Sequence, residues 1–427
     1  MRKSFSFLLA IGVCALLQIG AAAQSADLES TVPSETVKTT EMPSPDEAPA
    51  LSGAELRTRL TEAKQLLKSH ADLSGGKTVT LAAFDPETSE VHLFTVDKEL
   101  FLTKDASLLA RSQRGLEVRL TVIRANGVNT AVTVSDVSNG RALIPLMVAY
   151  PIVRDGSIAE VAYYASAHPA LLSSDVTSAG QSYVTTMLDK AARNLADKGV
   201  EIPNDIVEVA EHLCVVEHTD HKRFINEKHS ELFPEILSLY ALNQGNTYRY
   251  SVSTAGAGGM IQMIPRTYEG IREQHPVVPL QADFVSGMRD HANALQAMLL
   301  YMNDTWNKLE ESSDVKDALR SGIATKPELL AAGYNSNPGR LPSYLRNGGA
   351  NWRTLIPSET QMYLAIYKAV DQNVKFDPPS ERDIVAENSS ALDLETGLVD
   401  APHATSLMSW LTSALVTRSS VLIRFLP

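Results

Sequence analysis

The chain has 427 residues, more than one hydrophobic core usually holds, so we expect two folded domains together with unstructured segments. Apolar residues make up 44% and charged residues 21%, values that exclude a wholly disordered or fibrous protein. A formal net charge of -12 excludes an extensive basic surface for nucleic acid, and we expect a neutral or mixed-charge partner instead.

The N-terminus has the parts of a secretory signal peptide over residues 1–23. Arg2 and Lys3 precede an apolar run, and small residues follow it up to Ala23. The apolar run of about 15 residues is shorter than the ~20 that a membrane-spanning helix needs, which disfavours the alternative of a retained anchor. We therefore expect export to the periplasm or cell envelope. Residues 24–52 are rich in Ser, Thr, Pro and acidic side chains, as in a disordered tether.

Residues 53–168 are expected to form a small domain that is mostly antiparallel β. A helical stretch, Gly53 to His70, comes first, and turn-forming pairs such as Asp155-Gly156 separate the apolar runs that follow. No catalytic group of residues stands out here. We interpret this part as an accessory domain, either structural or a docking site for a cell-envelope protein. The predicted strands are TVTLAAF, VHLFTV, LEVRLTVIR, TAVTVSDV, LIPLMVAYPIV and IAEVAYYA.

Residues 169–375 have helical patterning throughout and are long enough for a separate all-α domain of roughly 200 residues. The predicted fold class is therefore α+β and multidomain, with the β part first. Residues 376–427 form a polar tail with an apolar C-terminal segment. Arg418 and Arg424 interrupt that segment, so it resembles a docking helix more than a membrane anchor.

One predicted helix places a carboxyl on an apolar face. It starts after Pro203, with Asp205 as the expected N-cap and Glu208 closing a capping box. Burial of Glu217 at its end is expected to raise the pKa of that carboxyl, so that it can donate a proton to a glycosidic oxygen. The alternatives are a Glu217 frayed into solvent or one paired with His218 or His221. The stripe that Glu217 continues consists of Ile206, Ala210, Leu213 and Cys214.

Residues 255–268, AGAGGMIQMIPRTY, combine flexible glycines with one amide, Gln262, inside an apolar run. A lone amide in such a run needs a hydrogen-bond partner. The run resembles the glycine-rich motif of the family 1 lytic transglycosylases, in which Ser and GA-x-G precede an apolar stretch with Gln and a final Pro-x-Thr. The residues that fit are Ser253, Gly256, Ala257, Gly259, Met260, Gln262, Met263, Pro265 and Thr267.

Two further motifs follow in the order of that family. Residues 333–342, GYNSNPGRLP, are similar to its Ala-Tyr-Asn motif, and residues 356–369, IPSETQMYLAIYKA, resemble its closing helix. With the helix that carries Glu217, the motifs span about residues 205–369. The resemblance therefore concerns the helical part alone.

The chain departs from the family pattern next to Glu217. The family has Ser directly after its catalytic Glu, and its glycine motif follows closely, whereas here His218 comes next and Ser253 stands 36 residues after Glu217. Residues 219–250 fill this gap, and we expect them to form an added helix and loop.

The resemblance implies a lysozyme-like fold that cleaves peptidoglycan between N-acetylmuramic acid and N-acetylglucosamine. Glu217 would be its single catalytic acid and base, the product would carry a 1,6-anhydro ring, and no cofactor or metal would take part. Glu211 is the second candidate for the acid, although helical phase places it off the apolar stripe. The residues implied to bind the glycan are Ser253, Met260, Gln262, Tyr334, Asn335, Glu359 and Tyr363.

Other functions stay open at this point. One is a hydrolase like the goose-type lysozymes, and another is a catalytically degenerate fold that binds glycan strands in the envelope. Tyr334 and Tyr363 are alternatively core aromatics, and Asn335 a turn residue. A metal site is a further alternative, but its spacings match neither HExxH nor paired Glu-x-x-His. Its ligands would come from Glu208, Glu211, His212, Glu217, His218 and His221.

Overall fold

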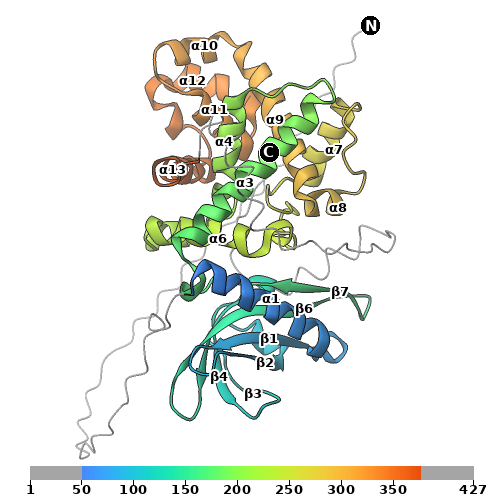
Figure 1. Ribbon diagram of the computed structural model, residues 1–427. Coiled ribbons are helices and arrows are strands. Elements are labelled where there is room, and N and C mark those ends of the chain that lie inside the picture. The colour runs from blue at the N-terminus through green and yellow to red at the C-terminus, as the bar shows by residue number, and fades with distance from the viewer. Residues whose placement is uncertain (1–50, 377–427) are drawn as a thin grey trace, which may run out of the picture. The chain divides into compact units, whose positions relative to one another are not determined.

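The computed structural model describes residues 51–376, all of which belong to one compact unit of the chain. An antiparallel sheet comes first and helices follow it, which confirms the predicted α+β class with a β part before a helical part (Figure 1). The expected signal peptide over 1–23, nearly all of the tether and nearly all of the tail over 376–427 lie outside the described residues. None of the helices within residues 51–376 is long and apolar enough to cross a bilayer.

Helix α1, Gly53–His70, has the bounds that the sequence predicts. Its N-cap, Ser52, accepts a hydrogen bond from the backbone N–H of Glu55, which satisfies one of the free donors at the helix start. One apolar stripe of α1 packs on the sheet and shares a core with it. The buried residues of the stripe are Leu56, Leu60, Ala63 and Leu67.

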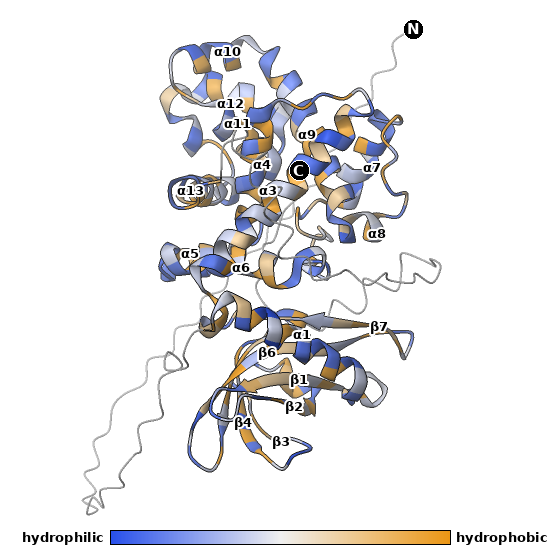
Figure 2. Cartoon of the chain, in the orientation of Figure 1, coloured by the Kyte–Doolittle hydropathy of each residue, from blue (hydrophilic) through white to orange (hydrophobic). Residues whose placement is uncertain are grey.

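The sheet has seven antiparallel strands in the order β2-β1-β6-β5-β4-β3, with β7 paired to β6. Apolar residues are concentrated on β1 and β6, which lie inside the sheet (Figure 2). In the turn between β6 and β7, Asp155 and Gly156 both have positive φ, as a tight hairpin requires. The strands are β1 Thr78–Asp85, β2 Glu90–Asp97, β3 Ser107–Arg111, β4 Glu117–Arg124, β5 Ala131–Asp136, β6 Ala142–Arg154 and β7 Ser157–Tyr164.

The sequence predicts six of these strands and misses β3. That strand has only five residues, and its Leu109 is 71% exposed, so its composition gives little sign of burial. One short helix, α2 Lys98–Phe101, stands between β2 and β3, where Asp97 caps it. The 3-10 turns of this part are η2 Ser74–Gly76, η3 Gly127–Asn129 and η4 Pro169–Leu171.

The helical part builds its core around α4 and α9. Helix α4 contacts α3, α6, α9, α11 and α13, so it is covered on nearly all sides. The helices are α3 Ser174–Ala196, α4 Asn204–Val216, α5 His221–Asn226, α6 His229–Asn243, α7 Pro265–Gln274, α8 Phe284–Arg289, α9 His291–Glu310, α10 Ser313–Arg320, α11 Lys326–Asn335, α12 Leu341–Gly348 and α13 Ser358–Asn373. The 3-10 turns are η5 Gln244–Asn246, η6 Pro338–Arg340 and η7 Gly349–Thr354.

Helix α6 joins the sheet to the other helices. Its Asn243 side chain pairs with both backbone groups of Ala165, just after β7, at 2.8 Å each. Leu239 is buried in the same core as the strands, and Glu235 forms an ion pair of 2.9 Å with Arg124 at the end of β4. Helices α5 and α6 together fill the stretch 219–250, which the sequence predicts to be an added helix and loop.

Candidate active site

Helix α4 differs from the predicted helix in two details. It begins at Asn204, no side chain caps it, and Asp205 instead forms an ion pair with Lys326 of α11 at 2.7 Å. The predicted capping box is therefore wrong. Burial also extends beyond the predicted stripe, since Val207, Val209, Val215 and Val216 are buried as well. Helical phase alone therefore does not single out Glu217.

Glu217 is the C-cap residue of α4 and is only 4% exposed. The hydroxyl of Tyr363, from α13, donates a hydrogen bond of 2.7 Å to its Oε1. Burial raises the pKa of Tyr363, so its hydroxyl stays protonated and remains a donor at physiological pH. Two of the predicted site residues, 146 positions apart, thus meet inside the helical part. Burial excludes a Glu217 frayed into solvent, one of the alternatives that the sequence left open.

His218 connects the end of α4 to the glycine-rich segment. Its Nε2 lies 2.8 Å from the carbonyl oxygen of Met260, and because a carbonyl only accepts, we assign the proton to Nε2. The ring stacks on Tyr248 with centroids 3.3 Å apart. Burial lowers the pKa of His218 to about 3, so the ring is neutral at pH 7. The residue that departs from the family pattern therefore holds the glycine-rich segment next to Glu217.

The glycine-rich segment folds into a tight loop. Ser253 closes a turn with Ala257, whose backbone N–H donates to the Ser253 hydroxyl at 3.0 Å. Gly259 has φ +68°, and a Cβ there would lie 2.3 Å from the carbonyl oxygen of Met288, so only glycine fits. This contact brings the loop directly against α8.

Gln262 finds its hydrogen-bond partners within the same loop. Its φ of 47° is unusual for a residue with a side chain, and its amide donates to the Gly259 carbonyl at 2.8 Å and to the Ser251 hydroxyl at 3.2 Å. A buried amide with these partners stabilises the strained backbone. The expectation that the amide needs a partner is confirmed.

Tyr334 holds the loop from the side of α11. Its hydroxyl donates a hydrogen bond of 2.8 Å to the carbonyl of Ile261, and its ring packs edge-on against Tyr301. Because His218 holds the carbonyl of Met260, two consecutive carbonyls of the loop are fixed by side chains from two helix ends. The Tyr334 hydroxyl, predicted to contact sugar, thus has a structural partner.

Two other predicted site residues retain polar atoms without a partner. Asn335 accepts a hydrogen bond from the Thr360 hydroxyl at 2.9 Å, while its buried Nδ2 has none. Glu359, beside Thr360 on α13, has a buried Oε1 that also lacks a partner, and burial raises the pKa of its carboxyl. Unpartnered buried polar atoms are costly, and a bound ligand is one explanation for them, although His92 and Asn129 of the β part have such atoms as well.

Glu211, the second candidate for the acid, lies elsewhere on α4. It is 1% exposed, contrary to its predicted place off the apolar face, and it accepts a hydrogen bond of 2.7 Å from Thr185 of α3. Its contacts join α3 to α4, which is a structural role.

The structure does not bring together the alternative metal ligands. Within residues 51–376, no group of three His, Cys, Asp or Glu side chains is placed to share an ion. The Nε2 of His218 points to a carbonyl, and His212 bonds the Glu208 carbonyl through Nδ1 at 2.8 Å.

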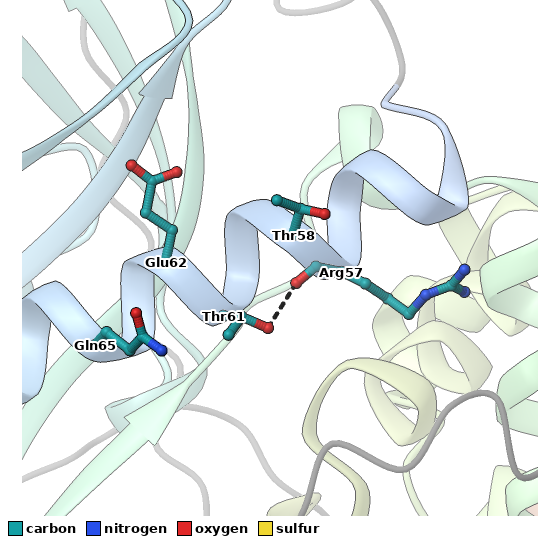
Figure 3. Close-up of a pocket in the computed structure, with 5 residues that line it drawn as sticks. All are labelled: Arg57, Thr58, Thr61, Glu62 and Gln65. Atoms are coloured by element: carbon teal, nitrogen blue, oxygen red, sulfur yellow. Dashed lines mark hydrogen bonds between the residues drawn. The ribbon is translucent and has the colours of Figure 1, made fainter.

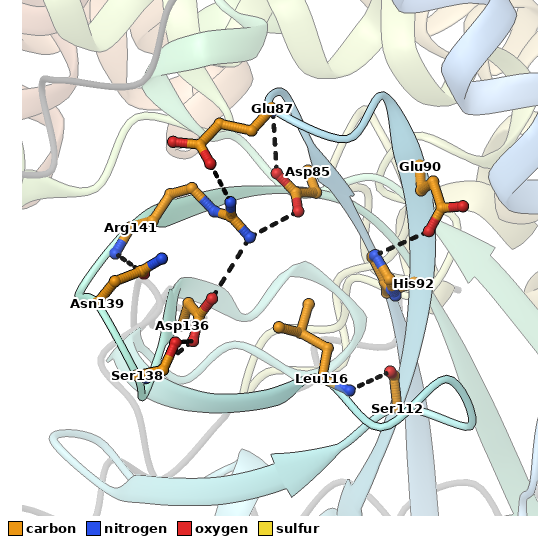
Figure 4. A network of polar contacts seen from close by, with 10 residues as sticks. All are labelled: Asp85, Glu87, Glu90, His92, Ser112, Leu116, Asp136, Ser138, Asn139 and Arg141. Carbon is orange, nitrogen blue, oxygen red and sulfur yellow. Dashed lines mark hydrogen bonds and ion pairs between the residues drawn. The ribbon is translucent and has the colours of Figure 1, made fainter.

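Two polar features lie in the first part of the chain. A shallow hollow on α1 is lined by Arg57, Thr58, Thr61, Glu62 and Gln65 of that single helix (Figure 3). At one end of the sheet, Arg141 contacts the carboxylates of Asp85, Glu87 and Asp136 (Figure 4). Neither feature gathers a predicted site residue.

Sequence reasoning missed two contributors to the site, Tyr248 and Thr360. Tyr248 lies within the insertion that has no counterpart in the family motifs, so only its contact with His218 reveals it. Thr360 follows Glu359 directly in a motif already noted, and its hydroxyl orients Asn335.

No family model, curated protein or solved structure matches the chain.

Proposed function

We propose that the chain is a peptidoglycan lytic transglycosylase, exported to the periplasm or cell envelope, with Glu217 as its single catalytic acid and base. The observation that carries the proposal is the contact between Glu217 and Tyr363, beside a glycine-rich loop that His218 holds in place. Three sequence motifs that resemble one enzyme family are thus linked by side-chain contacts to one another or to the end of the helix that carries Glu217. The other buried carboxyl of the same helix, Glu211, accepts a hydrogen bond from Thr185 of α3.

The proposed reaction needs only one carboxyl. Protonated Glu217 gives its proton to the glycosidic oxygen, and the bond between that oxygen and C1 of N-acetylmuramic acid breaks. The acetamido oxygen of the same sugar attacks C1 and stabilises its positive charge. The C6 hydroxyl then attacks C1 and displaces the acetamido oxygen, while the Glu217 carboxylate takes the hydroxyl proton. The product is a 1,6-anhydro sugar, Glu217 is protonated again, and water is not consumed.

The other residues have supporting roles in this proposal. Tyr363 orients the Glu217 carboxyl through the 2.7 Å hydrogen bond. The Nδ2 of Asn335 and the Oε1 of Glu359, which lack partners, are the groups best suited to bond sugar hydroxyls or amides. Ser253, Met260 and Gln262 shape the loop against which the glycan would lie.

The test compares Glu217→Gln with Glu211→Gln, two isosteric changes of buried carboxyls on the same helix. Purified sacculi are digested and the products are identified by mass spectrometry. We expect Glu217→Gln to lower release of anhydromuropeptides by about 100- to 10,000-fold, as loss of a general acid does. Glu211→Gln should stay within about threefold of the parent, since it removes no reacting group.

Each contrary result has a definite meaning. Reducing-end muropeptides without the anhydro ring would replace the transglycosylase with a hydrolase. Equal product from parent and Glu217→Gln would remove Glu217 from the mechanism. Glycan binding by a parent protein that releases no product would point to the non-enzymatic alternative.

A further inference from the structure

Glu160 of β7 contacts three side chains that belong to the helical part of the chain. Its Oε1 accepts a hydrogen bond of 2.6 Å from the Tyr250 hydroxyl and lies 3.5 Å from Nε of Arg249. Its Oε2 lies 3.2 Å from Arg289. The Glu160 side chain is 27% exposed, and those of Arg249 and Arg289 are 23% and 13% exposed. This carboxylate thus makes several contacts in a largely desolvated place.

The three partners stand at both edges of the glycine-rich loop. Tyr250 directly precedes Ser251, whose carbonyl accepts from the N–H of Gly259 at 3.1 Å and whose hydroxyl accepts from Gln262. Arg289 ends α8, directly after Met288, the residue whose carbonyl fills the space beside Gly259. Glu160 therefore holds the chain that enters the loop and the helix end against which the loop packs.

Charge gives Glu160 a role that a neutral group would not fill. Arg249 and Arg289 lie near the same Tyr250 ring, at 6.0 Å and 5.3 Å from its centroid, so their like charges are close together. Arg154 adds a third positive charge that acts on Arg289. A carboxylate between the guanidinium groups compensates this repulsion, and hydrogen bonds to charged groups are the strong ones.

We propose that Glu160 is a positioning residue for the active site: the sheet, through this one carboxylate, fixes the geometry of the glycine-rich loop. The functional part of this inference rests on the proposed transglycosylase activity. The sheet is then a structural component of the active site as well as an accessory domain. Glu160 touches none of the reacting groups, and it acts through Tyr250, Arg249 and Arg289.

The test uses the full chain and the variant Glu160→Gln, with Glu117→Gln as its matched control. Glu117 is also a carboxylate on the sheet, paired with Arg111 at 3.8 Å, but its side chain is 61% exposed. Hydrogen–deuterium exchange is followed in peptides that cover residues 251–263, and anhydromuropeptide release is measured in parallel. Tyr250→Phe serves as a second, milder variant, because it removes only the 2.6 Å hydrogen bond.

We expect Glu160→Gln to speed exchange of residues 251–263 by about 10-fold and to lower turnover by a similar factor, as loss of a charge-assisted bond would. Tyr250→Phe should change both in the same direction, and Glu117→Gln should change neither. Unchanged exchange of residues 251–263 in Glu160→Gln and Tyr250→Phe would overturn the proposal. If the parent releases no anhydromuropeptides while the exchange still responds, the proposed function fails and the positioning role of Glu160 stands.

Discussion

The sheet and the helical part both bury carboxyl groups, but they pair them with different chemical groups. At the end of the sheet, Asp85 and Asp136, 1% and 5% exposed, share the guanidinium of Arg141 (Figure 4). In the helical part, Glu217 instead accepts a hydrogen bond from the Tyr363 hydroxyl, while Asn335 and Glu359 keep buried polar atoms without hydrogen-bond partners. The comparison teaches that buried charge alone does not mark a site. An unpartnered polar atom alone does not mark one either, since the Nε of Arg141 and both ring nitrogens of His92 also lack hydrogen-bond partners; the atoms at Asn335 and Glu359 matter because they belong to the motifs of the proposed site.

The largest effect on stability is expected at Arg141. Arg141→Met keeps the apolar stem but leaves two buried carboxylates without their cation, which costs about 3–5 kcal/mol in the free energy of unfolding. Urea unfolding at pH 7 measures this loss. Arg114→Met is the control, because Arg114 pairs with Glu90 at 2.7 Å while 61% exposed, and such a pair contributes less than about 1 kcal/mol. Equal losses in the two variants would show that the cluster at Arg141 is an ordinary surface network.

A smaller effect, on pH dependence, is expected at His218. Burial lowers the pKa of its ring to about 3 in the folded chain, whereas an unfolded His titrates near 6.5. The unfolded state therefore binds the proton first, and the stability contribution of His218 is complete above pH 6.5 and is lost progressively as the pH falls toward 3. Between pH 7 and pH 5 the loss from this group amounts to about 2 kcal/mol.

The variant His218→Gln isolates that contribution. Gln can still donate to the Met260 carbonyl but does not titrate, so its stability should fall by about 2 kcal/mol less than that of the parent over the same pH range. His291 and His168, whose pKa values burial lowers to about 4, remain in both proteins and contribute to the residual dependence. If the free energy of unfolding fell by the same amount between pH 7 and pH 5 in variant and parent, this would contradict the assigned neutral ring.

Most of the fold follows from local patterns in the sequence. The bounds of α1 agree with the prediction because a capping Ser directly precedes the helix and an apolar stripe runs along it. Six strands are visible because their residues alternate between buried and exposed faces or form long apolar runs. The capping box of α4 fails because a tertiary contact, from Lys326 to Asp205, replaces the local one.

The site follows from local patterns only in part. No periodicity relates Glu217 to Tyr363. The resemblance to a family assigned both residues to one site, and the structure shows the hydrogen bond between them. His218 shows the opposite case. In the sequence, His218 is only a departure from the family pattern. Its role depends on contacts with Met260 and Tyr248, which come close to it only in the folded chain.

The smallest effect is expected at Glu359, where a substitution tests whether the unpartnered polar atom binds a ligand or has a structural role. Burial raises the pKa of this carboxyl, so its ionised form is disfavoured in the folded chain. The group therefore contributes most to stability at low pH. That contribution is lost as the pH rises through the folded pKa. Glu359→Gln removes the charge and should leave stability at pH 7 unchanged or slightly higher.

If the unpartnered Oε1 binds glycan, KM should nevertheless rise by about 3- to 10-fold while kcat changes less than about twofold, as loss of one bond to substrate predicts. Glu269→Gln, a change at an exposed carboxyl of α7, should alter none of these quantities. Unchanged KM together with lower stability would make Glu359 a structural residue, and it would leave Asn335 as the predicted glycan-binding residue with an unpartnered buried atom.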